Sequence, residues 1–213
     1  MMGDMRIGIL GTGVVGRAFG RVLSELGHEI TIGTREPEAT RVRDEWVESP
    51  LTLARYSDIR ADLWINATSG RGALAAVQSV GPALDGKVVI DTSNPLDFSQ
   101  GFPPTLFVSN TDSLAEQLQR SVPGARIVKM FSTTANEVMV DPRGLGHDST
   151  IFVAGDDETA RTEAANLARE LGWSDILDLG DLTAARGLEM WMPLWLRLYG
   201  AIGRAEFNIK VIR

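Results

Sequence analysis

The chain has 213 residues, a formal net charge of −7 and no cysteine. This length can bury a full hydrophobic core, and it fits one α/β domain with a short extension better than two complete domains. The negative charge argues against nucleic acid or a membrane as the main partner, and the lack of cysteine excludes disulfides, thiol catalysis and thiolate metal sites. The first residues lack an apolar signal core, so we expect a cytoplasmic protein.

A glycine-rich turn follows the first predicted strand. Residues 6–10 form an apolar run, a turn with three glycines comes next, and an amphipathic helical pattern follows. The residues of this turn are Gly11, Thr12, Gly13, Val14, Val15 and Gly16. A strand, a glycine turn and a helix in this order bring the N–H groups of the helix toward a pyrophosphate. The sequence therefore predicts a dinucleotide-binding site, with a glycine turn that holds no ligand as the alternative.

The second strand is predicted at residues 28–32 and leads to Gly33, Thr34 and Arg35. In this kind of fold the strand ends beside the adenosine ribose, where an acidic residue selects NAD and a cation accommodates the 2′-phosphate of NADP. Arginine donates two parallel hydrogen bonds to a phosphate, and threonine adds a hydroxyl. Glu36 could act as the ribose acid, but its position suits the first turn of the next helix better. We therefore expect NADP, with Thr34 and Arg35 at the phosphate; otherwise Arg35 is a solvated loop charge.

Strands and helices alternate through the rest of the chain, which is typical of a parallel sheet covered on both faces. Further strands are predicted at residues 63–67, 87–91, 126–130, 150–154 and 176–179. Helices are predicted at residues 72–80, at 158–171, and in a segment that ends near Ser121 and starts with a capping box of Ser113 and Glu116. Less regular are residues 36–47 (a broken helix and loop), 51–58 (a strand or a short helix) and 94–110 (a long loop). The expected fold class is α/β, a Rossmann-type, doubly wound, mostly parallel sheet with a C-terminal helical extension.

Three predicted strands end in polar segments with few charges, at residues 67–70, 91–95 and 131–136. Ligands bind outside the carboxyl ends of the strands in such sheets, so these segments are candidates for a nicotinamide pocket. The residues that we assign to this pocket are Ala67, Thr68, Ser69, Ser93, Asn94 and Thr133. Alternatively, the hydroxyl and amide side chains only cap helices and form turns. Asp91 is expected to be a buried acceptor that orients its loop, and Lys129 to be either a solvated or ion-paired residue or a general acid.

Over nearly its whole length the chain resembles the NADP oxidoreductases that work with the deazaflavin coenzyme F420. The dinucleotide-binding part is also similar to the cytosolic domains of the STEAP metalloreductases. Besides residues 11–16, 33–35 and 91–95, the segments that carry the resemblance are residues 129–133, 154–157, 188–190 and 208–210.

The resemblance implies roles for several residues. It implies pyrophosphate contacts from Thr12, Val14 and Val15. It also implies that Thr34 and Arg35 hold the 2′-phosphate. Members of the family commonly have a further basic residue where this chain has Ala39, and Arg41 or Arg43 could substitute for it. The implied hydride transfer runs directly between nicotinamide and deazaflavin rings, which requires alignment and exclusion of water rather than an acid or base. We assign no catalytic residue and no metal site.

Residues 182–202 are apolar on more than one helical face and contain Pro193. A proline in this position predicts two helices that meet near it, and a helix with more than one apolar face must be covered on more than one face. We divide the chain into an NADP-binding Rossmann domain, residues 1–180, and a helical segment, residues 181–213. This segment either packs in the core, completes the acceptor pocket or forms the interface of a homodimer, which we expect.

The resulting hypothesis is an NADP-dependent oxidoreductase of Rossmann type, with F420 as the leading hydride acceptor or donor. Its partner is a small-molecule redox co-substrate and not nucleic acid or a membrane. One alternative is an NADPH-dependent reductase of a flavin, a quinone-like ring or an imine. A second alternative is a non-catalytic NADP(H)-binding sensor. An open, ring-sized pocket beside the nicotinamide favours the enzymes, and a pocket filled by the aromatic C-terminal segment favours the sensor.

Overall fold

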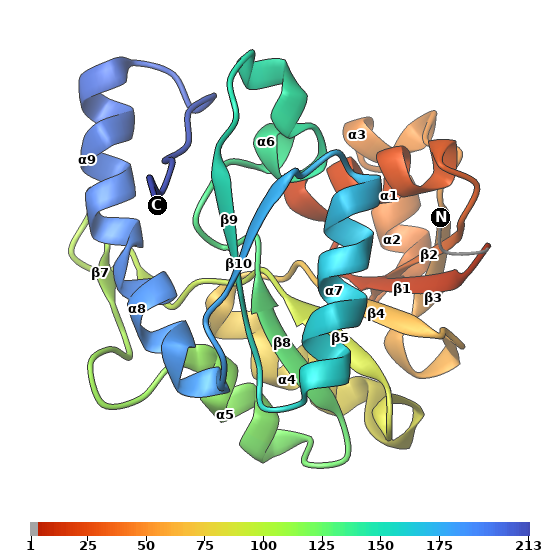
Figure 1. Cartoon of the computed structure of the whole chain (residues 1–213). Coiled ribbons are helices and arrows are strands. Elements are labelled where there is room, and N and C mark those ends of the chain that lie inside the picture. The colour runs from red at the N-terminus through yellow and green to blue at the C-terminus, as the bar shows by residue number, and fades with distance from the viewer. Residues whose placement is uncertain (1–3) are drawn as a thin grey trace.

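A computed structural model describes residues 4–213. The central sheet contains, in chain order, β1 (Arg6–Leu10), β2 (Glu29–Thr34), β3 (Thr52–Arg55), β4 (Leu63–Asn66), β5 (Val88–Asp91), β8 (Arg126–Met130), β9 (Thr150–Ala154) and β10 (Asp175–Asp178). Across the sheet the order is β10-β9-β8-β5-β4-β1-β2-β3 (Figure 1). Neighbouring strands run parallel except β8 and β9. The strand order reverses between β1 and β4, and this is where ligands of such sheets bind.

Helices cover both faces of this sheet. In chain order they are α1 (Val14–Glu25), α2 (Pro37–Arg41), α3 (Asp44–Val47), α4 (Gly70–Val80), α5 (Leu114–Ser121), α6 (Asn136–Val140), α7 (Glu158–Glu170), α8 (Ala185–Met190) and α9 (Met192–Ile202). Residues of α1, α6 and α7 share one buried hydrophobic cluster, and residues of α4, α5 and α8 share a second one. The fold is therefore the doubly wound α/β sheet that the sequence predicts.

The two clusters explain the continuous hydrophobic runs of the central strands. Successive side chains of a strand point to opposite faces. In β4, Leu63 and Ile65 pack in the cluster of α1 and α7, whereas Trp64 packs in the cluster of α4 and α5. All three side chains are buried. Burying a large apolar side chain contributes about 1.5–3 kcal/mol, so helices on both faces allow every residue of such a strand to add to stability.

The main predicted elements are confirmed, with shifted ends. Residues 51–58 contain both of the predicted alternatives, because β3 continues into a 3-10 turn at Tyr56–Asp58. The helix predicted at residues 72–80 begins earlier, at Gly70. A Cβ on Gly70 would lie 2.1 Å from the carbonyl oxygen of Asn94, so the glycine lets the start of α4 approach that loop.

The connection at residues 94–110 has regular structure that the sequence analysis missed. It contains a short antiparallel hairpin of β6 (Leu96–Asp97) and β7 (Thr105–Leu106). The chain then enters α5 through the predicted capping box, where the Ser113 hydroxyl accepts a hydrogen bond from the Glu116 N–H (3.1 Å). The hairpin thus ties the two halves of the connection together ahead of α5.

The last two strands of the sheet, β9 and β10, run opposite to the other strands. β9 pairs antiparallel with β8, with Lys129 opposite Ala154. Between them the chain forms α6, which was not predicted, and a 3-10 turn at Pro142–Leu145. An antiparallel neighbour needs no crossover over the face of the sheet, so the chain after β8 turns back beside it through α6 and the 3-10 turn.

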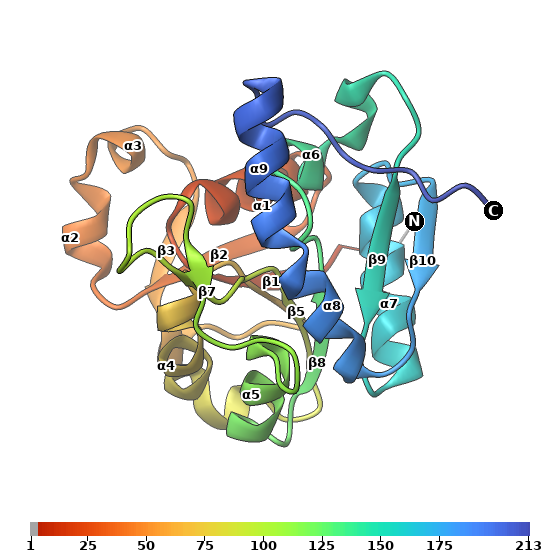
Figure 2. The ribbon, with the colours of Figure 1, turned by 90° about the vertical axis from the view of Figure 1, so that its left-hand side faces the viewer.

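The C-terminal segment forms two consecutive helices, as predicted. α8 ends and α9 begins around Trp191, and Pro193 lies in the first turn of α9, where a missing N–H costs no hydrogen bond. Beyond α9 the chain runs back to the start of β9, where the Ile209 carbonyl accepts from the Thr150 N–H (2.8 Å) (Figure 2). No helix within residues 4–213 is long and apolar enough to cross a membrane. The division into residues 1–180, of which 1–3 lie outside the described part, and 181–213 stays a prediction.

Candidate functional site

The three glycines of the first turn have different roles. Gly11 has a φ of +113°, and a Cβ there would lie 2.6 Å from the Ala67 carbonyl oxygen. A Cβ on Gly16 would lie 2.1 Å from the Gly11 carbonyl oxygen, so this glycine allows α1 to pack closely on the turn. Around a Cβ on Gly13, by contrast, no described atom lies within 4 Å. The three positions match the tight turn, close helix packing and open ligand approach of a dinucleotide fingerprint.

The start of α1 is free to bind an anion. Its N-cap is Gly13, no side chain caps it, and its first turn has no acidic residue. Trp46 Nε1 and Arg17 Nη1 donate to the Thr12 carbonyl at 3.2 and 3.1 Å, which holds the turn from behind. The unpaired N–H groups at a helix start and the helix dipole favour a phosphate. The turn is therefore preorganised for a pyrophosphate.

A groove of about 550 Å³ extends from this turn toward the end of β2. Its lining includes eight of the predicted residues, namely Gly11, Thr12, Gly13, Thr34, Arg35, Ala67, Thr68 and Ser69. Tyr56 also lines it; burial raises the pKa of the Tyr56 hydroxyl, and the positive charge of Arg35 acts in the opposite direction. The Thr34 hydroxyl is 2.9 Å from that of Thr40, so it is already oriented within the protein. Arg35 thus brings its charge to the end of the groove where a ribose phosphate would lie.

Only one of the two candidate second arginines reaches the groove. Arg43 lines it, together with Glu36. Arg41 instead donates to the carbonyl oxygens of Ser49 (2.9 Å) and Leu51 (2.7 Å). Arg41 therefore has a structural role, and Arg43 is the residue placed to support Arg35.

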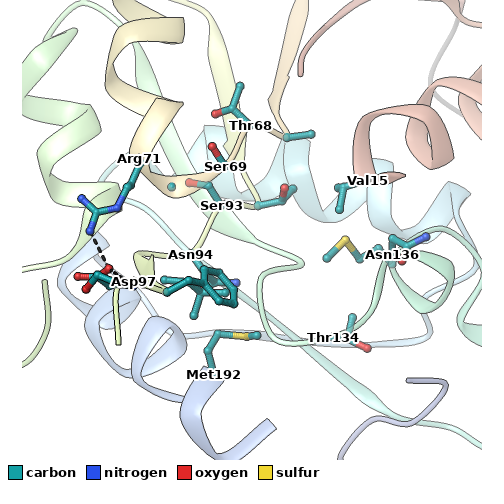
Figure 3. Close-up of a pocket in the computed structure, with 17 residues that line it drawn as sticks. Val15, Thr68, Ser69, Arg71, Ser93, Asn94, Asp97, Thr134, Asn136 and Met192 are labelled. Atoms are coloured by element: carbon teal, nitrogen blue, oxygen red, sulfur yellow. Dashed lines mark hydrogen bonds and ion pairs between the residues drawn. The ribbon is translucent and has the colours of Figure 1, made fainter. Parts of the chain in front are cut away.

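A second cavity of about 730 Å³ adjoins the groove and shares Ala67, Thr68 and Ser69 with it. Its polar lining includes the predicted residues Ser93 and Asn94. Its apolar lining includes Val15, Leu96, Phe98, Met139 and Met192. Figure 3 shows Thr68 and Ser69 on one side of the cavity and Met192 on the other. The cavity thus combines one polar wall with apolar surfaces that suit a flat ring.

Asn94 leaves an unpaired acceptor at this cavity. Its Nδ2 donates to the Ser132 carbonyl (2.8 Å), whereas its Oδ1 is buried without a hydrogen-bond partner. The Ser132 hydroxyl is also buried and unpartnered. Buried polar atoms usually have a partner, and of these two residues only Asn94 lines the cavity.

The cavity mouth carries an ion pair. Arg71 Nη2 lies 2.8 Å from Asp97 Oδ1 (Figure 3), and the Arg71 guanidinium lies over the Phe107 ring at 5.3 Å from its centroid. Hydrogen bonds from the Ser99 N–H and from Arg71 lower the pKa of Asp97 to about 2. Phe98 lines the cavity, whereas Phe102 is exposed on the hairpin.

Lys129 and Asp91 form a buried ion pair below the cavity. Lys129 Nζ lies 2.8 Å from Asp91 Oδ2 and 2.9 Å from Glu189 Oε1. Burial alone would lower the pKa of Lys129, but the charges of the two carboxylates outweigh this, and the pKa is raised. Lys129 is fully buried, so the structure favours the predicted ion-paired role over a general acid. Asp91 is the expected buried acceptor, since Ser93 and Asn66 donate to it.

Three predicted site residues lie outside the lining of both pockets. Val14 faces a separate hollow beside α1, and Gly16 packs against the turn. Thr133 is buried, and its carbonyl accepts from Trp191 Nε1 (3.0 Å). Lining residues that the sequence analysis did not assign are Arg71, Thr92, Leu96, Asp97, Ser99, Thr134, Asn136, Met139 and Met192. Thr134 and Asn136 belong to the candidate segment 131–136 but were not assigned individually, and Met192 belongs to the segment for which completion of the acceptor pocket was one alternative.

Comparisons with known proteins agree with this geometry. A family model described as NADP oxidoreductase, coenzyme F420-dependent, matches residues 6–95. The F420-dependent NADP reductase of Methanothermobacter marburgensis is 28% identical over 210 residues, which cover 91% of this chain and 92% of that protein. The crystal structure of a putative F420-dependent NADP-reductase from Arthrobacter sp. FB24 has a TM-score of 0.95 and 48% identity, and the match covers 99% of this chain and 100% of that one.

The expected likeness to the STEAP metalloreductases is also found. Metalloreductase STEAP3 of Rattus norvegicus is 26% identical over 204 residues, which cover 90% of this chain but 37% of that protein. The likeness to the two NADP reductases instead extends over nearly the whole of both proteins. The chain therefore belongs to the family of coenzyme F420-dependent NADP oxidoreductases.

Proposed function

We propose that this chain is an oxidoreductase that transfers a hydride between NADP(H) and coenzyme F420. The observation that carries the proposal is the pair of joined pockets: a groove with two arginines continues at Thr68 and Ser69 into a cavity of about 730 Å³. This volume lies in the usual range for small-molecule and cofactor sites. The relatives from Methanothermobacter marburgensis and Methanocaldococcus jannaschii are both F420-dependent NADP reductases.

The groove fits NADP(H) along its whole length. Gly13 leaves open space at an uncapped helix start, which suits the pyrophosphate. Arg35 and Arg43 supply cations for the 2′-phosphate. In the adjoining cavity, the unpaired Asn94 Oδ1 is an acceptor for the N–H groups of a carboxamide, such as that of nicotinamide.

When bound, NADPH supplies the hydride and the deazaflavin ring accepts it. The protein has to align the two rings and exclude water, which requires no acid or base. Val15, Met139 and Met192 provide apolar surface in the cavity. The charged side chains nearby are paired: Arg71 with Asp97, and Lys129 with Asp91. The site thus has surfaces for stacking and few groups that would transfer protons.

Other acceptors and a sensor role remain as alternatives. A reductase of a flavin, a quinone-like ring or an imine would use the same two pockets. A non-catalytic sensor would require the aromatic C-terminal residues to fill the cavity. Trp195 instead stacks on Tyr199 and Phe207, at ring distances of 5.7 and 5.2 Å, and is not part of the cavity lining. This arrangement favours an enzyme over a sensor.

The test mixes the purified protein with NADPH and oxidised F420 and follows the deazaflavin absorbance. We expect the absorbance to fall with NADPH and to change little with NADH. Met192→Trp is expected to fill the cavity and abolish turnover while NADPH binding persists. Met190→Trp is the matched control, because Met190 is exposed on the same segment. Tight NADPH binding without any loss of deazaflavin absorbance in the unmodified protein would contradict F420 as the acceptor.

We further propose that the protein is a homodimer joined through α9 and that it works in the cytoplasm. Leu194, Tyr199 and Ile202 are exposed on α9, and large apolar side chains gathered on one surface element favour an interface. α9 stands at one side of the molecule, where a second chain can reach it (Figure 1). The cytoplasm is the compartment that holds the NADP(H) pool such an enzyme consumes.

A further inference from the structure

A buried lysine below the cavity has all of its donors engaged. Lys129 Nζ lies within hydrogen-bond distance of Asp91 Oδ2, Glu189 Oε1 and the Ser93 carbonyl oxygen. An ammonium group has three N–H donors, so each donor has one acceptor. Lys129 is at the end of β8, Asp91 is opposite it at the end of β5, and Glu189 belongs to α8. The lysine therefore joins two strand ends to the C-terminal segment.

Ser93 lines the cavity, and each of its polar groups is hydrogen-bonded to Asp91 or Lys129. The Ser93 N–H and hydroxyl both donate to Asp91 Oδ1, at 3.2 and 2.7 Å, and its carbonyl accepts from Lys129. Asn94 follows directly and carries the unpaired acceptor. The position of the polar cavity wall thus depends on the charges of Asp91 and Lys129.

Glu189 connects the same lysine to the opposite side of the cavity. Its carboxylate accepts from the N–H groups of Leu114 (2.8 Å) and Ala115 (3.1 Å) at the start of α5, in addition to Lys129. Three residues further along, Met192 lines the cavity, on the side that faces Ser93 in Figure 3. Glu189 is almost completely buried, so its carboxylate has no access to water when one of these partners is lost.

We propose that Lys129 and Glu189 are positioning residues for hydride transfer: their ion pair fixes the separation between the cavity wall at Ser93 and the wall at Met192. This inference rests on the proposed function, because the separation matters only if two rings stack between the walls. Neither side chain lines the cavity, so both act through Ser93 and Met192. Hydride transfer depends steeply on the distance and orientation of the reacting rings.

Glu189→Gln tests the ion pair with the smallest change of shape. A carboxylate has two oxygens that can serve three donors, whereas the amide has one oxygen and an NH2 group that would face an N–H of α5 or Lys129. We expect kcat/KM for F420 to fall by at least about tenfold, mainly through kcat, and the Kd for NADPH to stay within about twofold. An unchanged kcat/KM, or an equal loss of NADPH binding, would overturn the proposal.

Glu116→Gln is the matched control. Glu116 also joins α5 to α8, through Arg186 Nη2 at 2.6 Å, but neither residue lines the cavity. A positioning role predicts that Glu116→Gln leaves kcat/KM within about twofold, even if it lowers the unfolding temperature as much as Glu189→Gln does. Equal losses of kcat/KM in both variants would mean that only general stability is involved.

Two further measurements test the ion pair if F420 is not reduced or if Glu189→Gln does not fold. If the unmodified protein does not reduce F420, the proposed function fails, but amide hydrogen exchange still tests the ion pair. The Ser93 amide is then expected to exchange at least about tenfold faster in Glu189→Gln than in Glu116→Gln, and equal rates would overturn the inference. If Glu189→Gln does not fold, Glu189→Asp keeps the charge but shortens its reach by one methylene, and the same losses are expected.

Discussion

Arg35 is the residue on which we expect the preference for NADP over NAD to depend. Replacing Arg35 by Ala removes a charge-assisted hydrogen-bond donor, a contact that contributes about 1.5–3 kcal/mol. The Kd for NADPH is expected to rise by about 10- to 100-fold, and that for NADH by less than about twofold. Fluorescence titration with both nucleotides measures the difference. Arg60→Ala is the control, since Arg60 is exposed and outside the groove; equal losses for NADPH and NADH would contradict the assignment.

Gly13 is expected to serve both nucleotides alike, because pyrophosphate is common to them. Its φ of −75° is one that alanine adopts, and a Cβ there meets no described protein atom. Gly13→Ala should therefore leave the unfolding temperature unchanged while its methyl group occupies ligand space. We expect the Kd for NADPH and for NADH to rise by at least about tenfold each. Gly187→Ala is the control, at an equally open helical glycine; unchanged nucleotide binding in Gly13→Ala would be evidence against the phosphate site.

Single residues also show which roles sequence patterns can predict and which they cannot. The glycine turn and Arg35 could be placed because each lies directly after a predicted strand. Arg41 and Arg43 could not be distinguished, since both follow at similar spacing. The difference arises because Arg41 reaches the carbonyl oxygens of Ser49 and Leu51, which belong to another segment. A sequence pattern contains no information about such contacts.

At the scale of elements, long amphipathic helices and buried strands were predictable and short pieces were not. The hairpin of β6 and β7 has two residues in each strand, too few to show an alternating pattern. The reversed direction of β9 and β10 could not be predicted from the sequence, for another reason. A buried strand has the same hydrophobic run in either direction, so its own sequence does not show whether it lies antiparallel to β8.

One carboxylate contributes ion pairs to the C-terminal tail, in addition to the backbone hydrogen bond between Thr150 and Ile209. Asp175 pairs with Lys210 (2.9 Å) and Arg213 (2.7 Å) and accepts from the Thr150 hydroxyl (2.5 Å). The hydrogen bond from Thr150 and those from the two basic residues lower the pKa of Asp175 from 3.8 to about 2. Because the pKa is lowered by folding, the stabilisation is complete above pH 3.8 and is lost as the pH falls through about 2.

Asp175→Asn is therefore expected to release the tail at neutral pH. The amide keeps a hydrogen-bonding oxygen but has no charge for Lys210 and Arg213. Carboxypeptidase digestion at pH 7 should remove the last residues of the variant several-fold faster than those of the unmodified protein. In the unmodified protein, hydrogen exchange of the Thr150 amide, which donates to Ile209, should rise only as the pH approaches 2. Equal digestion rates would show that other contacts hold the tail.

At the scale of the whole molecule, the sheet topology brings distant segments to one edge. The carboxyl ends of β1, β4, β5 and β8 lie next to each other, so the polar segments after them converge, as the sequence analysis expected. The far side of the cavity was predicted only as one of the alternatives for residues 181–213, and Met192 could not be identified as the residue that forms it. Met192 and Glu189 are far from Ser93 in the sequence. The packing of α8 against α5 brings them to this side of the cavity. Local patterns predict the wall made by strand ends, and tertiary contacts determine the other wall.

The oligomeric state of the protein can be tested at α9. Leu194 is 51% exposed on α9, although leucine is usually buried. If α9 joins two chains, the protein should sediment at twice 23.1 kDa, and Leu194→Glu should shift it to the monomer because a carboxylate would be buried at the interface. Val42→Glu, at an apolar residue that directly follows α2 and is 74% exposed, should leave the dimer intact. A monomer at all concentrations, or equal dissociation in both variants, would contradict the α9 interface.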